Sequence, residues 1–408
     1  MQVFLVVASP YTKLLARDFE GQRLQRAGFD FRVVDAGDVY LPHLRNHYGD
    51  LENGSNVTYI RNQDQLNSFA SSLTASDVVF FDAVTDEHLS SPESLYNVVS
   101  KSTAKLAGAS TGIVTPPPPF SADAAHWLRR RSRQMQEAIQ HPRETVSWVG
   151  KRISRRVDPG SRFWGSANSQ PIPQSKPLNF LWIGHSSNLF SSRIISNSTF
   201  VRYIHTMDYE LISRETIKEA QECDYLVFLD GMGPSHPDLL QSTPSQHYKI
   251  SSSEYRRLIG RALKSVELLT GYRVIVAAHP RNPAGSLVGA YGHFPVSEHN
   301  TPGLVAGSRA VIDAGCSTSL GMAVVARRPV LFLKSGFFAK PIDRRQRDTA
   351  RSLALPRISI DEPVTKWRIP DVNLLAYQRY VETFMKRRDT AQGSFWDQVA
   401  KDLRTIVG

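Results

Sequence analysis

The stretch YLVFLDGMG, residues 225–233, decides the fold expected for this 408-residue chain. Five apolar residues run without interruption into an aspartate and two glycines. This pattern predicts a buried strand of a parallel sheet followed by a turn. A second stretch of the same kind, RVIVAAHPRN at residues 273–282, runs into His279, Pro280 and Arg281. Buried strands that end in polar turns are typical of α/β proteins, which bind ligands at the carboxyl ends of their strands.

The same rhythm extends outward from these two stretches into both halves of the chain. Apolar runs predict further strands at residues 3–8, 31–34, 77–82, 111–114, 179–184, 200–204, 310–312 and 329–333. Helical spacing of apolar residues predicts helices at residues 11–27, 254–269, 317–326, 374–387 and 395–406. Alternating strands and helices build parallel sheets covered by helices. We therefore predict an α/β fold with two Rossmann-like domains facing each other across a cleft.

Four successive prolines, Pro116–Pro119, interrupt this rhythm, because proline neither donates to a strand ladder nor continues a helix. A basic helix and a stretch containing Ser, Pro and Gly follow, which is typical of a connection between domains. We predict an N-terminal domain at residues 1–119 and a basic helix and linker at 120–177. A C-terminal domain is expected at 178–370, and C-terminal helices at 371–408 that can cross back to the N-terminal domain.

The formal net charge of +11 at pH 7 is compatible with nucleic acid, an anionic membrane face or a phosphorylated substrate. Much of the excess lies in clusters at residues 129–133, 151–156 and 344–347. These clusters lack the interleaved aromatic residues that stack on bases, so we predict no nucleic-acid partner. Two interpretations of the clusters remain: a solvated surface, or a peripheral contact with an anionic membrane.

Cysteine content and hydropathy bear on the compartment. Cys223 and Cys316 are the two cysteines, and neither has metal-ligand spacing around it, which argues against a disulfide framework and a zinc site. No stretch of about 18 uncharged apolar residues predicts a membrane-spanning helix. The apolar N-terminus lacks the basic region of a signal peptide and predicts a strand instead. We expect a cytoplasmic protein, with peripheral contact at the inner face of the membrane left open.

Candidate functional residues follow three predicted strands of the second half. Asp230 ends the first of these strands, where it could act as general base toward an acceptor hydroxyl or as a nucleophile, and Gly231 keeps it open to a ligand. His279 and Arg281 end the second strand, with Pro280 fixing the exit of the chain, and both side chains can donate hydrogen bonds to phosphate. A turn aspartate and a structural histidine are the alternatives that stay open.

The third candidate is the hydroxyl-rich turn Ser317, Thr318 and Ser319, which opens a predicted helix. Side-chain and backbone donors at the positive end of a helix dipole suit a phosphate, and N-capping alone accounts for one hydroxyl but not for three. A purely structural cap stays open as the alternative. Asp313, at the end of the preceding strand, is expected beside the helix or at a nucleotide ribose rather than on a metal.

Several other chemistries find no motif in the sequence. The G-x-x-x-x-G-K-[ST] loop is absent, and no G-x-G-x-x-G follows the first strand, which disfavours ATP hydrolysis and ordinary NAD chemistry. A G-x-S-x-G elbow is absent as well, so an esterase triad has no anchor. No Asp-x-Asp motif stands at a strand end, and we predict no metal site.

At these residues the sequence resembles the GT-B glycosyltransferases that use CMP-activated acidic sugars, notably bacterial sialyltransferases. The resemblance covers residues 179–335. Those enzymes carry an Asp/Glu-Asp-Gly motif with the catalytic carboxylate, a His-Pro motif at the donor phosphate and a Ser/Thr-Ser/Thr motif beside that phosphate. The matching residues here are Asp230 with Gly231, His279 with Pro280, and Ser317 with Thr318 and Ser319. Leu229 stands where the family has its first acidic residue. Similar stretches occur in proteins of surface-polysaccharide gene clusters that transfer Kdo-like or nonulosonic sugars.

The resemblance implies a GT-B-like transferase of surface-polysaccharide biosynthesis, with no cofactor beyond its nucleotide-sugar donor. That donor would be CMP-linked, bound by the C-terminal domain without an essential metal, and a glycan acceptor would bind the N-terminal domain. Fixed donors at His279, Arg281 and the hydroxyl turn would stabilise the charge on the leaving phosphate. The alternatives are a glycerol- or ribitol-phosphate transferase, a nucleotide-sugar epimerase, or a non-catalytic protein that binds an anionic polymer. Donor sugar, acceptor, linkage, stereochemical outcome and oligomeric state are left undetermined.

Overall fold

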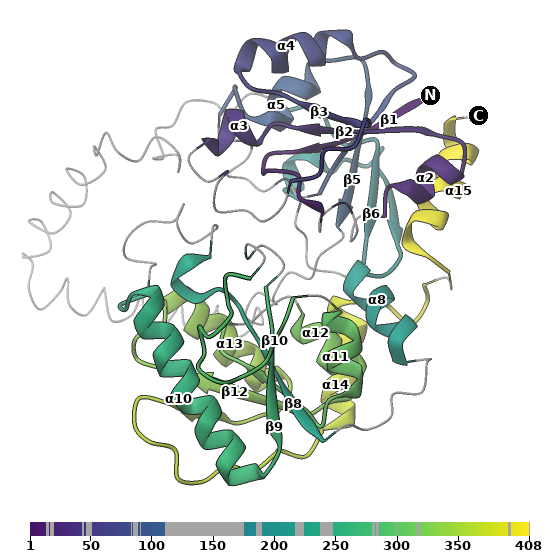
Figure 1. Cartoon of the computed structure of the whole chain (residues 1–408). Coiled ribbons are helices and arrows are strands. Elements are labelled where there is room, and N and C mark those ends of the chain that lie inside the picture. Colours follow the sequence, from purple (N-terminus) through teal and green to yellow (C-terminus); the bar gives the residue numbers. More distant parts are fainter. Residues whose placement is uncertain are drawn as a thin grey trace, which may run out of the picture.

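The structure, a computed structural model, describes residues 1–13, 16, 20–42, 45, 51–82, 84, 89, 91–110, 175–184, 190–216, 224–236, 248–279, 282, 285–298, 300–315, 319–390 and 393–407. Within these residues the chain forms two parallel sheets, one in each half of the molecule in Figure 1. The predicted α/β fold with two Rossmann-like domains is confirmed. The predicted strand at 111–114 and the basic helix and linker lie outside the described residues.

The first sheet has seven strands in the order β3-β2-β1-β4-β5-β6-β7. All of its pairings are parallel, and its strands are β1 (Gln2–Val7), β2 (Asp30–Asp35), β3 (Val57–Tyr59), β4 (Val78–Phe81), β5 (Lys105–Ser110), β6 (Phe180–Ile183) and β7 (Phe200–Tyr203). The predicted strands at 3–8, 31–34 and 77–82 coincide with β1, β2 and β4. β1 and β4 are buried almost throughout, which is why they read as continuous apolar runs, whereas Arg32 in the middle of β2 is exposed.

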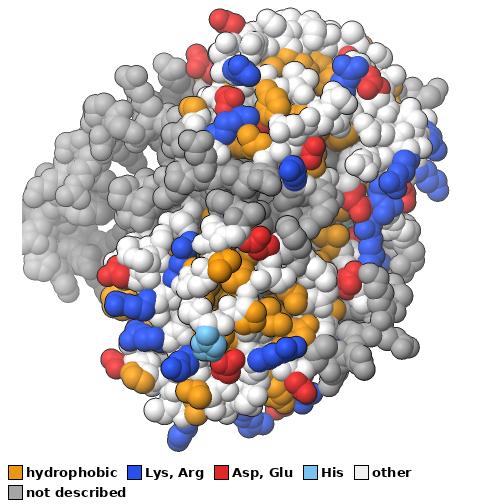
Figure 2. Space-filling view, in the orientation of Figure 1, with side chains coloured by type: hydrophobic (Ala, Val, Ile, Leu, Met, Phe, Trp, Pro, Cys, Tyr) orange, Lys and Arg blue, Asp and Glu red, His pale blue; other side chains and the backbone are white. Residues whose placement is uncertain are grey.

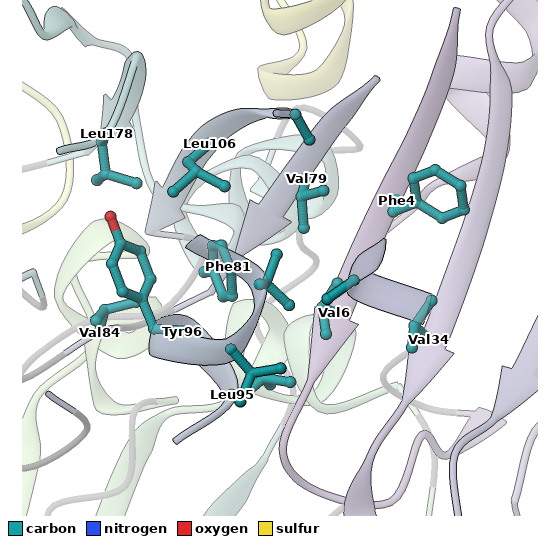
Figure 3. Close-up of a cluster of buried hydrophobic side chains, with 14 of the residues drawn as sticks. Phe4, Val6, Val34, Val79, Phe81, Val84, Leu95, Tyr96, Leu106 and Leu178 are labelled. Carbon is teal, nitrogen blue, oxygen red and sulfur yellow. The ribbon is translucent and has the colours of Figure 1, made fainter. Parts of the chain in front are cut away.

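Helices cover both faces of this sheet. One face packs against α4 (Gln63–Ser72) and α5 (Leu95–Ser100), with α3 (Gly37–Tyr40) close by. Figure 3 shows this layer, in which the rings of Phe81 and Tyr96 pack at a tilt of 54° with centroids 5.0 Å apart. The other face packs against α2 (Gln22–Arg26) and the C-terminal helix α15 (Phe395–Val407). A short 3-10 helix, η3 (Ser192–Ile194), connects β6 to β7.

The predicted boundary at residue 178 is wrong. β6 and β7 were assigned to the C-terminal domain, but β6 pairs with β5 and β7 pairs with β6, so both strands extend the first sheet. Asn179 fixes the junction, because its side-chain oxygen accepts a hydrogen bond from the Leu106 backbone N–H at 2.8 Å. An apolar run identifies a strand but not its neighbour, and the neighbour here lies some 70 residues earlier in the chain.

The second sheet has six strands in the order β10-β9-β8-β11-β12-β13. These are β8 (Tyr225–Leu229), β9 (Arg273–Ala277), β10 (Val296–Ser297), β11 (Ala310–Asp313), β12 (Val330–Lys334) and β13 (Arg357–Ser359), again all parallel. In chain order this is 3-2-1-4-5-6, the doubly wound arrangement. The order reverses between β8 and β11, so the switch point of the sheet lies between these two strands.

One face of the second sheet packs against α10 (Ser252–Thr270). A capping box of Ser251 and Glu254 begins this helix, and Gly271 in the left-handed conformation ends it. The other face is covered by α8 (Met207–Thr216), α11 (Thr301–Gly307), α12 (Leu320–Val325), α13 (Lys340–Ser352) and α14 (Leu374–Phe384).

The C-terminal helices divide between the two domains. α14 packs on α12 in the second domain, whereas α15 returns to the first sheet, where Phe395 and Trp396 are fully buried. Trp182 of β6 donates its indole N–H to Asp402 of α15 at 2.9 Å, in a buried hydrogen bond. Figure 1 shows α15 beside α2, close to the N-terminus of the chain.

Within the residues that the structure describes, the chain crosses between the domains after β7 and again after α14, and the two crossings touch. His205 forms an isolated antiparallel bridge with Lys386, and the Thr206 backbone N–H donates to the Met385 carbonyl at 2.9 Å. α8, which follows the first crossing, packs on α11 and α12 of the second domain. The first domain therefore ends with β7 and not at the proline run.

Glu210 of α8, a buried carboxylate, contacts residues at both crossings. Its Oε2 accepts from the Phe395 backbone N–H at 2.9 Å and contacts the His205 ring at 3.1 Å. Arg214 pairs with Glu210 and reaches Glu20 of the first domain at 2.7 Å. Burial alone would raise the pKa of Glu210, but the hydrogen bonds from His205 and Phe395 and the charge of Arg214 lower the pKa to about 2.

Candidate functional site

Three of the predicted site segments follow neighbouring strands of the second sheet. β9 and β11 flank β8, and all three run parallel, so their carboxyl ends lie at the same edge. Two strand spacings, about 10 Å, separate β9 from β11. The loops after β8 and β11 lie side by side where these strands end, since a Cβ built on Gly231 would lie 3.9 Å from the Gly315 Cα.

Asp230 is buried, with 2% of its surface exposed, and both of its oxygens accept hydrogen bonds. Oδ1 accepts from the Met232 backbone N–H at 2.9 Å and from the Tyr291 hydroxyl at 2.7 Å, and Oδ2 accepts from the Asn282 amide at 2.7 Å. Burial, together with the Asp230 charge, raises the pKa of Tyr291 well above its ordinary value, so its hydroxyl stays a donor. These contacts favour a structural role for Asp230 over the predicted role as base or nucleophile.

The turn after Asp230 has an unusual backbone. Met232 adopts the left-handed conformation with φ of 59°, and Gly233 has φ of 50°. A Cβ on Gly233 would lie 2.6 Å from the ring of Tyr255, a buried residue of α10, so a side chain is excluded at this position. Backbone strain of this kind persists where the surroundings enforce it, and here the hydrogen bond between Met232 and Asp230 does so.

His279 follows β9 after one intervening residue, Ala278, and is half-buried. Its ring packs edge-on against the ring of His236, with centroids 5.2 Å apart. His236 was not among the predicted site residues, although its position in the same loop as Asp230 was a signal that it could lie there. The structure thus brings two imidazoles together from the loops after β8 and β9. Of the other residues predicted here, Pro280 and Arg281 lie outside the described residues.

Ser319 is the N-cap residue of α12, and its side chain makes no capping hydrogen bond to the first turn of that helix. Ser317 and Thr318 lie outside the described residues, so the predicted convergence of the hydroxyl turn with His279 stays a prediction. Asp313 ends β11 and is fully buried. Its carbonyl accepts from the side chain of Gln346 at 3.3 Å, which links the end of β11 to α13.

Metal binding and membrane insertion were also considered for the described part of the chain. No group of three or more His, Cys, Asp or Glu side chains there could hold a metal ion. Within the same residues no helix is both long and apolar enough to cross a membrane. Figure 2 shows lysine and arginine side chains distributed over both domains on the face displayed, with acidic side chains among them. The predicted contact with an anionic membrane stays a prediction.

No protein-family model matches the chain, and no curated protein matches it. Among solved structures it is similar to MurG of Acinetobacter baumannii, with a TM-score of 0.42, 8% identity and 99% of each chain covered. The glycosyltransferase SnogD from Streptomyces nogalater gives 0.44 at 10% identity, covering 100% of this chain and 99% of that chain. Spinosyn forosaminyltransferase SpnP gives 0.40 at 14% identity, covering 94% and 90%. At such values the activity has to be argued from the residues of this chain.

Proposed function

We propose that this protein is a glycosyltransferase whose nucleotide-sugar donor binds at the carboxyl edge of the second sheet. The observation that carries the proposal is the meeting of Gly231 and Gly315 at the switch point between β8 and β11. Doubly wound sheets bind nucleotides at this point, and glycines let the backbone approach a phosphate closely. Within the described residues, nothing lies nearer than 3.9 Å to a Cβ built on either glycine.

The residues beside this switch point supply donors for a leaving phosphate. His279 stands at the end of β9, next to His236, and Ser319 stands at the start of α12 after β11. Hydrogen-bond donors fixed before the reaction stabilise the negative charge that develops on a departing nucleoside phosphate. Arg281, with Pro280, follows β9, and Ser317 and Thr318 precede Ser319 in the sequence. Because the arginine and the two hydroxyl residues would add further donors to the phosphate, the site would act without a metal ion.

The sequence resemblance supports a CMP-linked acidic sugar as the donor and a surface glycan as the acceptor, the acceptor binding on the first domain. The resemblance implies a catalytic role for Asp230, but this proposal gives it a different role. Its three hydrogen bonds fix the positions of Met232 after β8, Asn282 after β9 and Tyr291 relative to one another. The loop after β8 is thereby held so that Gly231 faces Gly315. Asp230 is thus proposed as a positioning residue.

A nucleotide-binding experiment tests the proposal. CMP, UDP, GDP and ADP are titrated into the full chain, and the melting temperature is recorded, because a ligand that binds the folded state raises it. We expect CMP to raise it most. Gly315→Val, which adds a side chain at the switch point, should abolish the CMP shift while leaving the ligand-free melting temperature within about 2 °C of wild type, a difference of roughly 1 kcal/mol or less.

Two histidine variants, His279→Ala and His293→Ala, provide a matched comparison. His279→Ala should weaken CMP binding about tenfold, the loss of one charge-assisted hydrogen bond. His293→Ala should leave binding unchanged, because His293 is an exposed histidine of the same domain that contacts Glu267. If no nucleotide shifts the wild-type protein, or if Gly315→Val binds CMP like wild type, the proposal fails. Transfer from CMP-activated sugars to glycan acceptors, followed by product analysis, then distinguishes transfer of a sugar from transfer of a polyol phosphate.

A further inference from the structure

A cavity of about 540 Å³ opens at the carboxyl ends of β12 and β13. Five basic side chains line it: Lys249 from the segment before α10, Lys334 from the end of β12, and Lys340, Arg344 and Arg347 from the first half of α13. The Lys249 backbone N–H donates to the Phe337 carbonyl at 2.9 Å, which fixes the first segment against the loop between β12 and α13. Segments far apart in the sequence thus bring their cations to one hollow.

The two acidic residues of this cavity are already engaged by other partners. Asp361 accepts from the Ser335 hydroxyl with one oxygen and from the Gly336 backbone N–H with the other, at 3.0 Å for the second bond. Asp343 pairs with Arg357 and lies 3.6 Å from Arg347. Asp361 therefore holds one wall of the cavity in place, while Asp343 partly neutralises Arg347 and Arg344 lies 4.0 Å from Asp348. These ion pairs do not include the three lysines.

Lys249, Lys334 and Lys340 form no ion pair with any described residue. Five cations against two carboxylates leave the lining with a net charge of three positive units. Like charges gathered in one hollow repel each other, and an anionic ligand relieves that repulsion. The 13-residue helix α13 also begins here, and its N-cap residue, Ala339, provides no side-chain cap for the first backbone amides. The positive end of its dipole adds to the field.

We propose that this cavity binds a phosphoryl group carrying at least two negative charges. Lysine ammonium groups act as point charges on phosphate, and arginine adds a fork of donors, so the set suits a phosphate ester or diphosphate better than a single carboxylate. β12 is the neighbour of β11, which places the cavity at the same edge of the sheet as the switch point but on the far side of β12. The inference does not depend on the proposed transferase activity.

Calorimetric titration of the full chain with inorganic pyrophosphate, glycerol 3-phosphate and malonate tests this proposal. We expect pyrophosphate to bind most tightly, and Lys334→Ala and Lys340→Ala each to weaken it about tenfold, the loss of one charged contact. Lys264→Ala is the matched control, since Lys264 is an exposed lysine of α10 that lines none of these surfaces, and it should leave binding unchanged.

Each outcome bears on the proposal. Because the lysines are exposed, the variants should melt at the wild-type temperature, which a scan without ligand confirms. Pyrophosphate binding that survives Lys334→Ala/Lys340→Ala, or that Lys264→Ala weakens equally, would overturn the site. Tighter binding of malonate than of pyrophosphate would overturn the assignment to phosphate. Gly315→Val should retain pyrophosphate binding even though it loses CMP, so failure of this site and failure of the nucleotide site give different results.

Discussion

Replacing Asp230 by alanine should destabilise the second domain rather than remove a catalytic group. Alanine would leave three donors, the Met232 N–H, the Tyr291 hydroxyl and the Asn282 amide, without the carboxylate that they share. A net hydrogen bond to a charged group contributes about 1.5 to 3 kcal/mol, and the unsatisfied donors add to the loss. Allowing for relaxation and for water entering the gap, we expect a loss of about 3 kcal/mol.

Asparagine is the informative substitution, because its side chain has the same shape. Its oxygen can still accept from Met232 and Tyr291, and its amino group then faces the amide of Asn282. A flip of the Asn282 amide restores that third hydrogen bond. We therefore expect Asp230→Asn to cost about 1 kcal/mol. Tyr291→Phe, which removes one of the three donors, should cost about 1.5 kcal/mol by the same reasoning.

Thermal unfolding and a transfer assay on the same samples distinguish the two roles of Asp230. At about 2 to 4 °C per kcal/mol, the alanine variant should melt about 6 to 12 °C below wild type and the asparagine variant about 2 to 4 °C below. A positioning residue leaves Asp230→Asn active, whereas a general base does not. An inactive Asp230→Asn protein with an unchanged melting temperature, or an Asp230→Ala protein that melts like wild type, would refute the structural role.

Two further predictions concern Glu210, which links the two domains, and the packing of α15 on the first sheet. The pKa of Glu210 is lowered to about 2 in the folded chain, so its stabilising contribution is present above about pH 4.5 and is lost as the pH falls toward 2. Between pH 7 and pH 3, the melting temperature of the wild type should fall as this contribution is lost, and Glu362→Gln, an exposed control, should behave in the same way. The melting temperature of Glu210→Gln should be lower at pH 7 and should fall less. Trp396→Ala should cost about 3 to 5 kcal/mol, because it empties a fully buried site between α15 and the first sheet. Urea unfolding measures that loss, and Leu374→Ala, at an exposed position of α14, should cost little.

Four of the six strands of the second sheet could be predicted from the sequence with their bounds nearly complete. Residues 225–229, predicted as a strand, are β8. The predicted strand at 273–278 is one residue longer than β9, and the predicted strand at 329–333 is shifted by one residue from β12. A parallel strand buried on both faces needs a continuous apolar run, and that requirement is local. Weaker signals were missed: β3, β10 and β13 are two or three residues long and have no such run.

Only some of the residues of the candidate site could be predicted from the sequence. A polar residue after an apolar strand identifies the edge of the sheet, which is how His279 and Asp230 were selected. Whether such a residue meets a ligand or the protein depends on residues elsewhere, such as Tyr291, which lies 61 positions after Asp230. The contact of His236 with His279 and the cavity beside β12 could not be predicted for the same reason, since their rings and cations come from separate segments.

By itself, then, the sequence determined that this chain forms two parallel α/β domains and which strands end in chemically useful residues, because both follow from the order of apolar and polar side chains along a few residues. Tertiary structure alone decided that β6 and β7 join the first sheet, that α15 and not α14 returns to cover it, and that the Asp230 carboxylate is enclosed by donors. Such contacts join residues far apart in the sequence, and 220 positions separate Trp182 from Asp402 in their hydrogen bond. They depend on which surfaces meet when the chain packs, and no local pattern records that.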